Sequence, residues 1–94
     1  MREKEIENYL VKKVKNLNGL CFKFISPGNA GVPDRIVIKN GKLIFMELKA
    51  PGKNVRALQR LQIDKLLKHG QIVYVADSKE KIDLILKQEF ENDI

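Results

Sequence analysis

Apolar residues recur at helical spacing in three stretches of the chain. Four of them mark the first stretch: Ile6, Leu10, Val14 and Leu17. Their spacing matches one face of a helix, and Asn18-Gly19 ends the pattern. The second stretch, residues 55–67, is followed by Lys68-His69-Gly70, and basic residues before a glycine are typical of a helix C-terminus. The third follows Ser78, a common N-cap residue, so we predict three helices.

Other apolar segments predict four strands. In residues 20–25, Leu20, Phe22 and Phe24 alternate with Cys21, Lys23 and Ile25, and residues 26–31 contain the glycines and proline of a loop. Residues 36–38 and 43–46 are apolar and flank a short polar segment. Residues 71–76 form a nearly continuous apolar run, as expected for a strand buried on both faces. The predicted order is αβββαβα, which favours an α/β fold with a mixed central sheet and helices on both of its faces.

The dipeptide Asn40-Gly41 predicts a tight hairpin between the second and third strands. Asn-Gly between apolar strands is the strongest short-range signal for a two-residue type I′ turn. If these residues form the turn, Lys39 lies opposite Lys42, and counting back along both strands places Asp34 opposite Glu47. Opposed side chains in an antiparallel pair have Cβ atoms about 4.5–5.5 Å apart. The hairpin therefore brings two carboxylates together.

These two carboxylates need compensation for their charge. Like charges in opposed positions repel each other, and burial in an apolar sheet adds a further cost. A divalent cation bound by both would supply the compensation. Lys49 lies two residues beyond Glu47 and projects from the same face of the strand. Asp34, Glu47 and Lys49 are therefore the candidate site: two carboxylates and one ammonium group.

These residues resemble the Pro-Asp…(Asp/Glu)-x-Lys nucleases, and in particular the virus-type replication-repair nuclease (VRR-NUC) family. The resemblance rests on Gly31-Val32-Pro33-Asp34-Arg35, on residues 45–52 with their Glu-Leu-Lys-Ala-Pro-Gly, on Leu58-Gln59 and on residues 70–75. It implies the restriction-endonuclease-like three-layer fold of this family. A chain of 94 residues is long enough for one domain, so we expect a single nuclease-like domain over residues 1–94.

The resemblance also implies a site for Mg²⁺ or Mn²⁺. Mg²⁺ usually takes one or two protein carboxylates and keeps several waters, and Asp34 and Glu47 match that requirement. The family implies the backbone carbonyl of Leu48 as a further ligand. The chain has one cysteine and one histidine, so no zinc-like cluster of these residue types competes for the metal.

Two roles remain open for Lys49. Its ammonium group could orient the attacking water, lower the pKa of that water and offset charge on the phosphate, or it could serve only as a structural counterion for the acids. Gln59 likewise has two interpretations. It matches a polar position that the family places at the edge of the active site, where it would position DNA or water, but it could also lie on a solvated helix face.

The family resemblance implies a further catalytic glutamate on the first helix. Glu7 is the better match by its distance from Asn18-Gly19, and Glu3 lies one turn earlier on the same face. Either glutamate could instead be ordinary surface charge.

The charge balance favours a nucleic-acid partner. The net charge is +6, which suits a polyanion, and several basic residues could contact phosphates without any one being assigned: Lys12, Lys13, Lys15, Lys39, Lys42, Lys53, Arg56 and Arg60. Cys21 lies in an apolar segment and is expected to be a packing residue. No apolar stretch resembles a signal peptide or a membrane span, so we expect a cytoplasmic protein without membrane contact.

The resemblance implies a metal-dependent DNA endonuclease. Small stand-alone members of the family are expected to form homodimers that cut branched DNA such as four-way (Holliday) junctions. A viral or prophage origin, with activity in a bacterial host cell, is expected by the same route. Two alternatives stay open: a nucleic-acid-binding module whose metal site is vestigial, and a basic interaction domain whose acids form surface ion pairs. Metal-dependent cleavage by the purified protein would exclude both.

Overall fold

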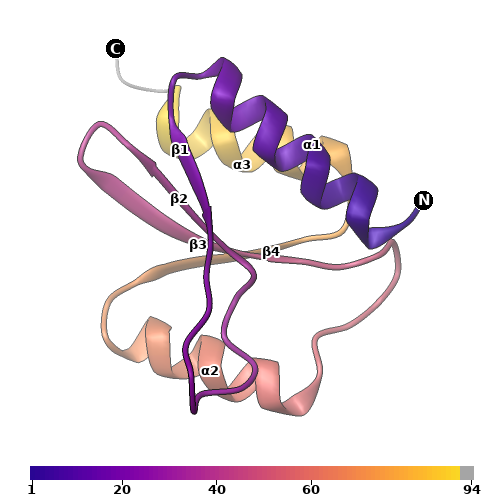
Figure 1. Cartoon of the computed structure of the whole chain (residues 1–94), viewed down its shortest axis with the longest axis vertical. Helices are drawn as coiled ribbons and strands as arrows, with labels where there is room; N and C mark the ends of the chain where they lie inside the picture. Colours follow the sequence, from indigo (N-terminus) through magenta and orange to yellow (C-terminus); the bar gives the residue numbers. More distant parts are fainter. Residues whose placement is uncertain (92–94) are drawn as a thin grey trace.

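The computed structural model describes residues 1–91 (Figure 1). Its elements follow in the order α1 (Glu3–Asn16), β1 (Leu20–Lys23), β2 (Arg35–Lys39), β3 (Lys42–Leu48), α2 (Ala57–Lys68), β4 (Ile72–Ala76) and α3 (Lys79–Phe90). The predicted αβββαβα order is therefore confirmed. Within these residues, no helix combines the length and the apolar character that crossing a bilayer requires.

The four strands form one mixed sheet in the order β1-β2-β3-β4. The first three strands are antiparallel neighbours, and β4 runs parallel to β3 after the crossover through α2. Asn40 and Gly41 both have positive φ, 50° and 79°, as a type I′ turn requires. Lys39 pairs with Lys42, and the pairing continues to Arg35 and Met46. The hairpin register predicted from Asn-Gly is thus confirmed.

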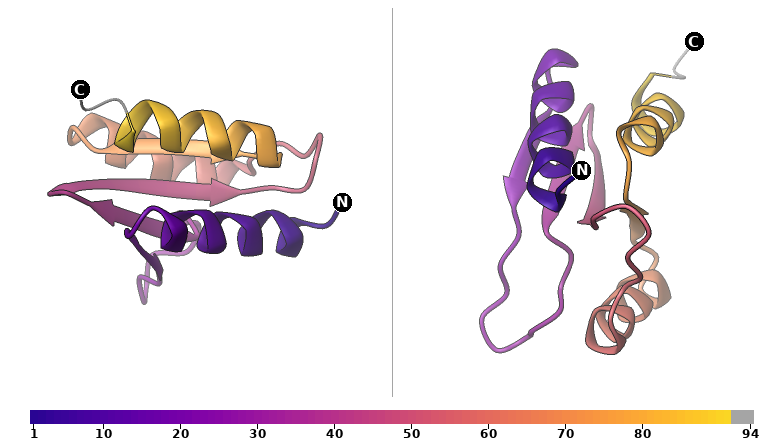
Figure 2. Two further views of the ribbon diagram at one scale, coloured as in Figure 1. Left: turned by 90° about the horizontal axis from the view of Figure 1, so that it is seen from above. Right: turned by 90° about the vertical axis from the view of Figure 1, so that its right-hand side faces the viewer.

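Helices cover both faces of the sheet and give three layers. In Figure 1, α1 and α3 lie side by side above the strands and α2 lies below them; Figure 2 shows the same arrangement from two other sides. The main core lies between the sheet and the α1–α3 pair, and its fully buried members include Ile6, Leu10, Ile44, Met46 and Leu48. Because side chains alternate along β3, Phe45 and Glu47 point to the opposite face, toward α2.

The prediction that residues 71–76 are buried on both faces was wrong, and α2 also leaves apolar residues exposed. The buried residues of α2 are Gln59 and Ile63, whereas Leu58 and Leu61 are each half exposed. A single helix covering one side of the sheet buries only a narrow stripe, and the apolar residues beside that stripe remain at the surface. The strand β4 is only partly buried apart from Ala76, because it is an edge strand of the sheet and not an internal one.

Candidate active site

Glu47 is the buried centre of the candidate site. Only 1% of its surface is exposed. Its Oε2 atom accepts a hydrogen bond from Gln59 Nε2 at 2.9 Å and lies 3.6 Å from Lys49 Nζ. Its Oε1 atom is buried and has no hydrogen-bond partner within residues 1–91. A buried carboxylate oxygen without a partner carries a substantial desolvation cost. This oxygen is therefore available to a ligand.

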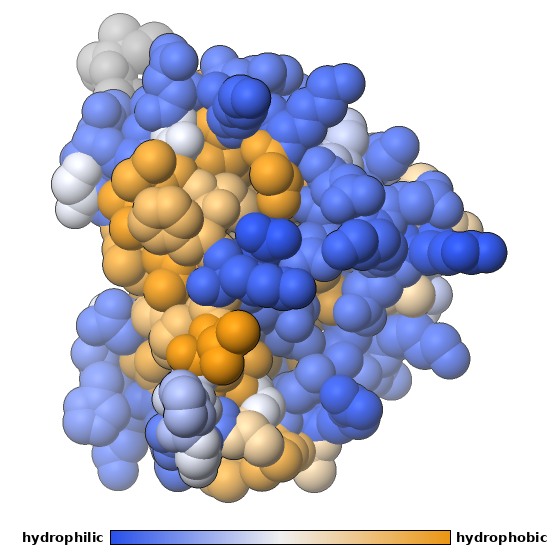
Figure 3. Space-filling view, viewed as in Figure 1, coloured by the Kyte–Doolittle hydropathy of each residue, from blue (hydrophilic) through white to orange (hydrophobic). Residues whose placement is uncertain are grey.

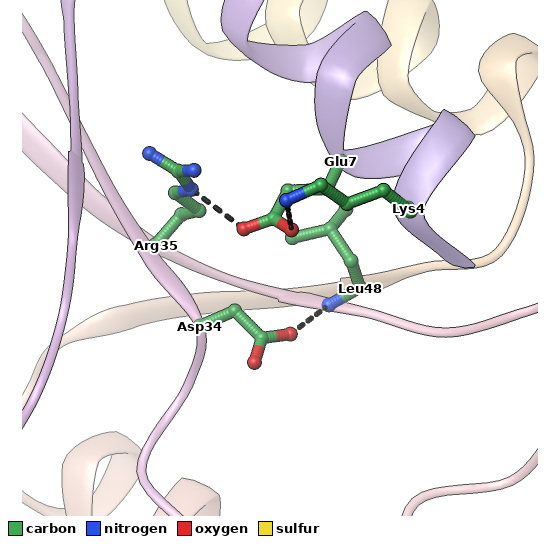
Figure 4. A network of polar contacts seen from close by, with 5 residues as sticks. All are labelled: Lys4, Glu7, Asp34, Arg35 and Leu48. Atoms are coloured by element: carbon green, nitrogen blue, oxygen red, sulfur yellow. Dashed lines mark hydrogen bonds and ion pairs between the residues drawn. The ribbon is translucent and has the colours of Figure 1, made fainter.

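Asp34 lies immediately before β2 and is held by backbone contacts. Its Oδ2 atom accepts a hydrogen bond from the Leu48 N–H at 2.9 Å, and its carbonyl accepts one from the Phe24 N–H at 2.8 Å. Figure 4 shows the other carboxylate oxygen directed away from Leu48. These contacts fix Asp34 beside the end of β3, where the hairpin register predicts that it faces Glu47.

The environment of Glu47 disfavours its charged form. Burial raises the pKa of Glu47 from 4.5, the negative charge of Asp34 acts in the same direction, and the Lys49 ammonium group opposes them, with a resulting pKa of about 7. A cation placed beside both carboxylates would lower this pKa again, because it favours the charged form of each. The two acids thus form a site whose electrostatics improve when a cation binds.

The acids and Lys49 open into a pocket of about 480 Å³, called here the active-site pocket. It is lined by Glu3, Asp34, Glu47, Lys49, Ala50, Lys53, Asn54, Arg56 and Gln59. Lys49 is 7% exposed, so its aliphatic part is buried while its ammonium group reaches the pocket. The pocket therefore combines three carboxylates with three cations. The structure brings Asp34, Glu47, Lys49 and Gln59 together in this one pocket.

Gln59 is a buried partner of Glu47 and does not lie on a solvated helix face. Its Nε2 donates to Glu47, and its Oε1 accepts a hydrogen bond from the Arg56 N–H at 2.9 Å. The second contact lies at the first turn of α2 and fixes the orientation of the amide. Gln59 consequently positions the Glu47 carboxylate, a role that the sequence alone did not predict.

The loop before Asp34 packs closely against α2 at Gly31. Gly31 has φ of +92°, and a Cβ atom at this position would lie 2.8 Å from the carbonyl oxygen of Leu58. Both the backbone conformation and the contact therefore require glycine. Gln62 Nε2 also donates to the Ala30 carbonyl at 3.3 Å. This packing explains the glycine of the Gly-Val-Pro-Asp segment: it lets the loop approach α2 and deliver Asp34 to the site.

The structure brings Glu3, and not Glu7, into the active-site pocket. Glu7 Oε2 accepts a hydrogen bond from Arg35 Nε at 2.9 Å, and its Oε1 lies 3.9 Å from Lys4 Nζ (Figure 4). The two glutamates share a face of α1, as expected, but Arg35 lies beside Glu7 and pairs with it. The sequence-based preference for Glu7 does not match these positions, because it could not include the position of Arg35.

The donor set fits a hard divalent cation. Asp34 and Glu47 share the active-site pocket and could supply two carboxylate ligands, and within residues 1–91 no group of three or more His, Cys, Asp or Glu side chains is placed to hold a metal ion. A pair of carboxylates with room for water suits Mg²⁺ or Mn²⁺ and not a structural zinc site. The Leu48 N–H binds Asp34, while the role of the Leu48 carbonyl stays a prediction.

Comparisons with known proteins found a similar phage protein and a similar solved structure. No model of a protein family matches the chain. The protein called "Putative nuclease p44" of Acyrthosiphon pisum secondary endosymbiont phage 1 is 44% identical over 81 residues, which are 85% of this chain and 87% of that protein. A solved structure called "VRR_NUC domain" is similar to this chain with a TM-score of 0.83 and 26% sequence identity. The match covers 94% of this chain and 96% of the chain of that structure. The chain therefore belongs to the VRR-NUC family of nucleases.

Proposed function

We propose that this protein is a Mg²⁺- or Mn²⁺-dependent endonuclease that hydrolyses phosphodiester bonds in DNA. The observation that carries the proposal is the state of Glu47: it is buried beside a second carboxylate, and its Oε1 atom lacks a partner within the described chain. A purely structural acid would be satisfied by hydrogen bonds or an ion pair at both oxygens. A bound divalent cation accounts for the unsatisfied oxygen and for the pairing with Asp34.

Five of the residues that line the pocket have a role in this proposal. Asp34 and Glu47 would hold the metal ion, which when bound would supply charge stabilisation at the phosphate and a lowered pKa for the attacking water. Lys49 lies 3.6 Å from Glu47, close enough to orient a water beside the metal ligands and to offset negative charge on the phosphate. Gln59 fixes the orientation of Glu47, and Glu3 adds a third carboxylate at the rim.

The direct test is cleavage of labelled DNA by the purified protein. Branched, linear and single-stranded substrates are each incubated with Mg²⁺, with Mn²⁺ and with chelator. We expect metal-dependent cuts in the wild type and none in Asp34→Ala or Glu47→Ala. If either variant retained near wild-type turnover, the metal-site assignment would be wrong. Binding of DNA by the wild type without any cleavage would support the alternative, a binding module with a vestigial metal site.

We further propose that the protein acts as a homodimer on branched DNA such as four-way junctions. Resolving such a junction requires two nicks on opposed strands, and a two-fold dimer presents two identical sites. Support comes from apolar side chains exposed on and just after the edge strand β1. Leu20 and Phe22 of β1 are 51% and 53% exposed, and Ile25, two residues after the strand, is 74% exposed. Figure 3 shows apolar surface gathered over β1 and the adjoining β2–β3 hairpin. An exposed apolar edge strand favours pairing with a second copy.

Sedimentation at micromolar concentration tests this assembly. We expect a dimer in the wild type and a shift toward monomer in Phe22→Lys, which places a charge in the apolar surface of β1. A particle of about 10.8 kDa, with and without junction DNA, would contradict the paired-nick mechanism but not the nuclease function. The similarity to a phage protein is consistent with our proposal that the protein acts in the cytoplasm of a bacterial host.

A further inference from the structure

A second, basic pocket of about 210 Å³ lies beside the active-site pocket, and we call it the lateral pocket. It is lined by Lys53, Asn54, Val55, Arg60, Val75, Asp77 and Lys81. Lys53 and Asn54 line both pockets, so the two hollows are neighbours across the segment that links β3 to α2. None of the predicted roles at the active site involves Lys81, Asp77 or Val75.

The register of the sheet places the lateral pocket one strand away from Glu47. Val75 of β4 pairs with Glu47 of β3 in the parallel ladder. Neighbouring strands are about 4.7–4.9 Å apart, and paired residues of parallel strands point to the same face. A ligand over Val75 would therefore be an immediate neighbour of a ligand over Glu47, on the same side of the sheet.

The charges of the lateral pocket favour an anion. Three cations, Lys53, Arg60 and Lys81, face one carboxylate, Asp77, which leaves a net charge of three minus one, or +2. Asp77 Oδ2 accepts a hydrogen bond from the Gly52 N–H at 3.3 Å, so this acid helps to hold the linking segment. Neither lysine forms an ion pair within residues 1–91.

Arg60 can exchange its present partner for an anion. Its Nη1 atom lies 3.5 Å from Asp64 Oδ1, and the two side chains are 51% and 59% exposed. An exposed ion pair of this kind contributes little to stability. A phosphate group accepts charge-assisted hydrogen bonds from a guanidinium group and can replace so weak a partner.

We propose that the lateral pocket binds a phosphodiester of the DNA backbone that neighbours the scissile one on the cleaved strand. The inference rests on the proposed nuclease function and adds a second contact to it. The active-site pocket carries the acids that suit a metal ion, whereas the lateral pocket carries cations that suit a phosphate. Together they would fix the direction of the strand, because two adjacent phosphates define a line across the end of the sheet. Backbone contacts of this type set position and not base sequence.

The first experiment compares two double variants of equal charge. Arg60→Gln with Lys81→Gln removes cations of the lateral pocket, and the control, Lys65→Gln with Lys68→Gln, removes two cations from the far end of α2. DNA affinity is measured over a range of salt with Ca²⁺ in place of Mg²⁺ to prevent cleavage. Losing one phosphate contact should reduce the slope of log K against log salt by about 0.9 in the first variant and leave the control unchanged. Equal slopes in the two variants would overturn the proposal.

The second experiment identifies the phosphate itself. A single uncharged methylphosphonate linkage is moved stepwise along the cleaved strand, and affinity is measured for the wild type and for the Arg60→Gln, Lys81→Gln variant. At one linkage beside the scissile position, the substitution should weaken the wild type by several fold and the variant hardly at all, since the contact is already absent. No such coupled linkage would overturn the inference. A gain in wild-type affinity from a 5′-phosphate, lost in the variant, would also overturn it by pointing to a terminal phosphate.

These results are separable from the nuclease function. Cleavage by the wild type in Mg²⁺ is scored independently of the binding data. Cleavage without a coupled linkage refutes the lateral-pocket inference alone. A coupled linkage without cleavage refutes the nuclease function, and it then supports a phosphate contact at the lateral pocket but not its position beside a scissile linkage. The four substituted side chains, Arg60, Lys65, Lys68 and Lys81, are all exposed, so folding should be unchanged, and matching circular dichroism spectra verify this.

Discussion

Replacing Glu47 with glutamine should change how the stability of the metal-free protein depends on pH. The pKa of Glu47 is about 7 in the folded protein, against 4.5 as its ordinary value. Between these values the folded state binds more protons than the unfolded state, so the free energy of unfolding falls as the pH rises from about 4.5 to about 7 and then levels off. In Glu47→Gln, residue 47 cannot ionise, so the unfolding free energy of the variant should not show this decrease.

The magnitude follows from the same two pKa values. A pKa difference of one corresponds to about 1.4 kcal/mol, so the wild type should lose about 3 kcal/mol over this range relative to Glu47→Gln. That loss is a large part of the stability of a small domain, which is about 5–15 kcal/mol. The variant keeps an acceptor for Gln59 Nε2. Its lost attraction to Lys49 adds no separate pH dependence, because the charge of Lys49 already contributes to the pKa of Glu47.

Urea unfolding of both proteins in chelator, from pH 4.5 to pH 8, measures this difference. Other titrating groups affect both proteins alike, so the informative quantity is the wild-type free energy minus that of Glu47→Gln at each pH. Mg²⁺ at pH 8 should restore wild-type stability, because it binds the folded state, and should have a smaller effect on the variant. Parallel curves without metal would refute the argument that burial and Asp34 disfavour the charged form of Glu47.

Three further predictions test neighbouring parts of the site. Lys49→Ala should abolish cleavage while retaining Mn²⁺ binding by titration, because both carboxylates remain; loss of metal binding would make Lys49 structural. Glu7→Gln should lower stability by about 1–3 kcal/mol, since Arg35 would lose its partner, without weakening Mn²⁺ binding; weaker metal binding at unchanged stability would instead place Glu7 among the ligands. Gly31→Ala should lower both the unfolding free energy and the cleavage rate. The control is Gly28→Ala, because Gly28 also has a positive φ but a Cβ atom there would have no neighbour within 4 Å. This control should lower the unfolding free energy by only about 1 kcal/mol and leave cleavage intact.

The parts of the fold that depend on local chemistry could be predicted from the sequence. Asn40-Gly41 determines the turn type, and the turn type determines the register of β2 and β3. Because that register brings Asp34 near Glu47, the central pair of the site follows from counting residues. The helices follow from periodicity in the same way, although α2 begins at Ala57 and not at Val55.

Features that depend on how elements pack could not be predicted in this way. Leu58 and Leu61 have helical spacing, yet Gln59 is the buried residue of that turn because it meets Glu47 across the interface between α2 and the sheet. Similarly, the choice between Glu3 and Glu7 depends on Arg35, which reaches α1 from β2. In both cases a polar contact between distant segments outweighs the pattern within one segment.

The lateral pocket shows the same limit for binding surfaces. The net charge of +6 indicates a polyanionic partner but does not say which cations converge. The sequence indicated Arg60 as a candidate phosphate contact but did not indicate Lys81. The two residues lie in different helices, α2 and α3, with the strand β4 between them in the sequence, so their proximity depends on the fold. The parallel crossover brings the two together beside Val75, the residue paired with Glu47. The crossover from β3 through α2 to β4 therefore also places these cations next to the buried acids.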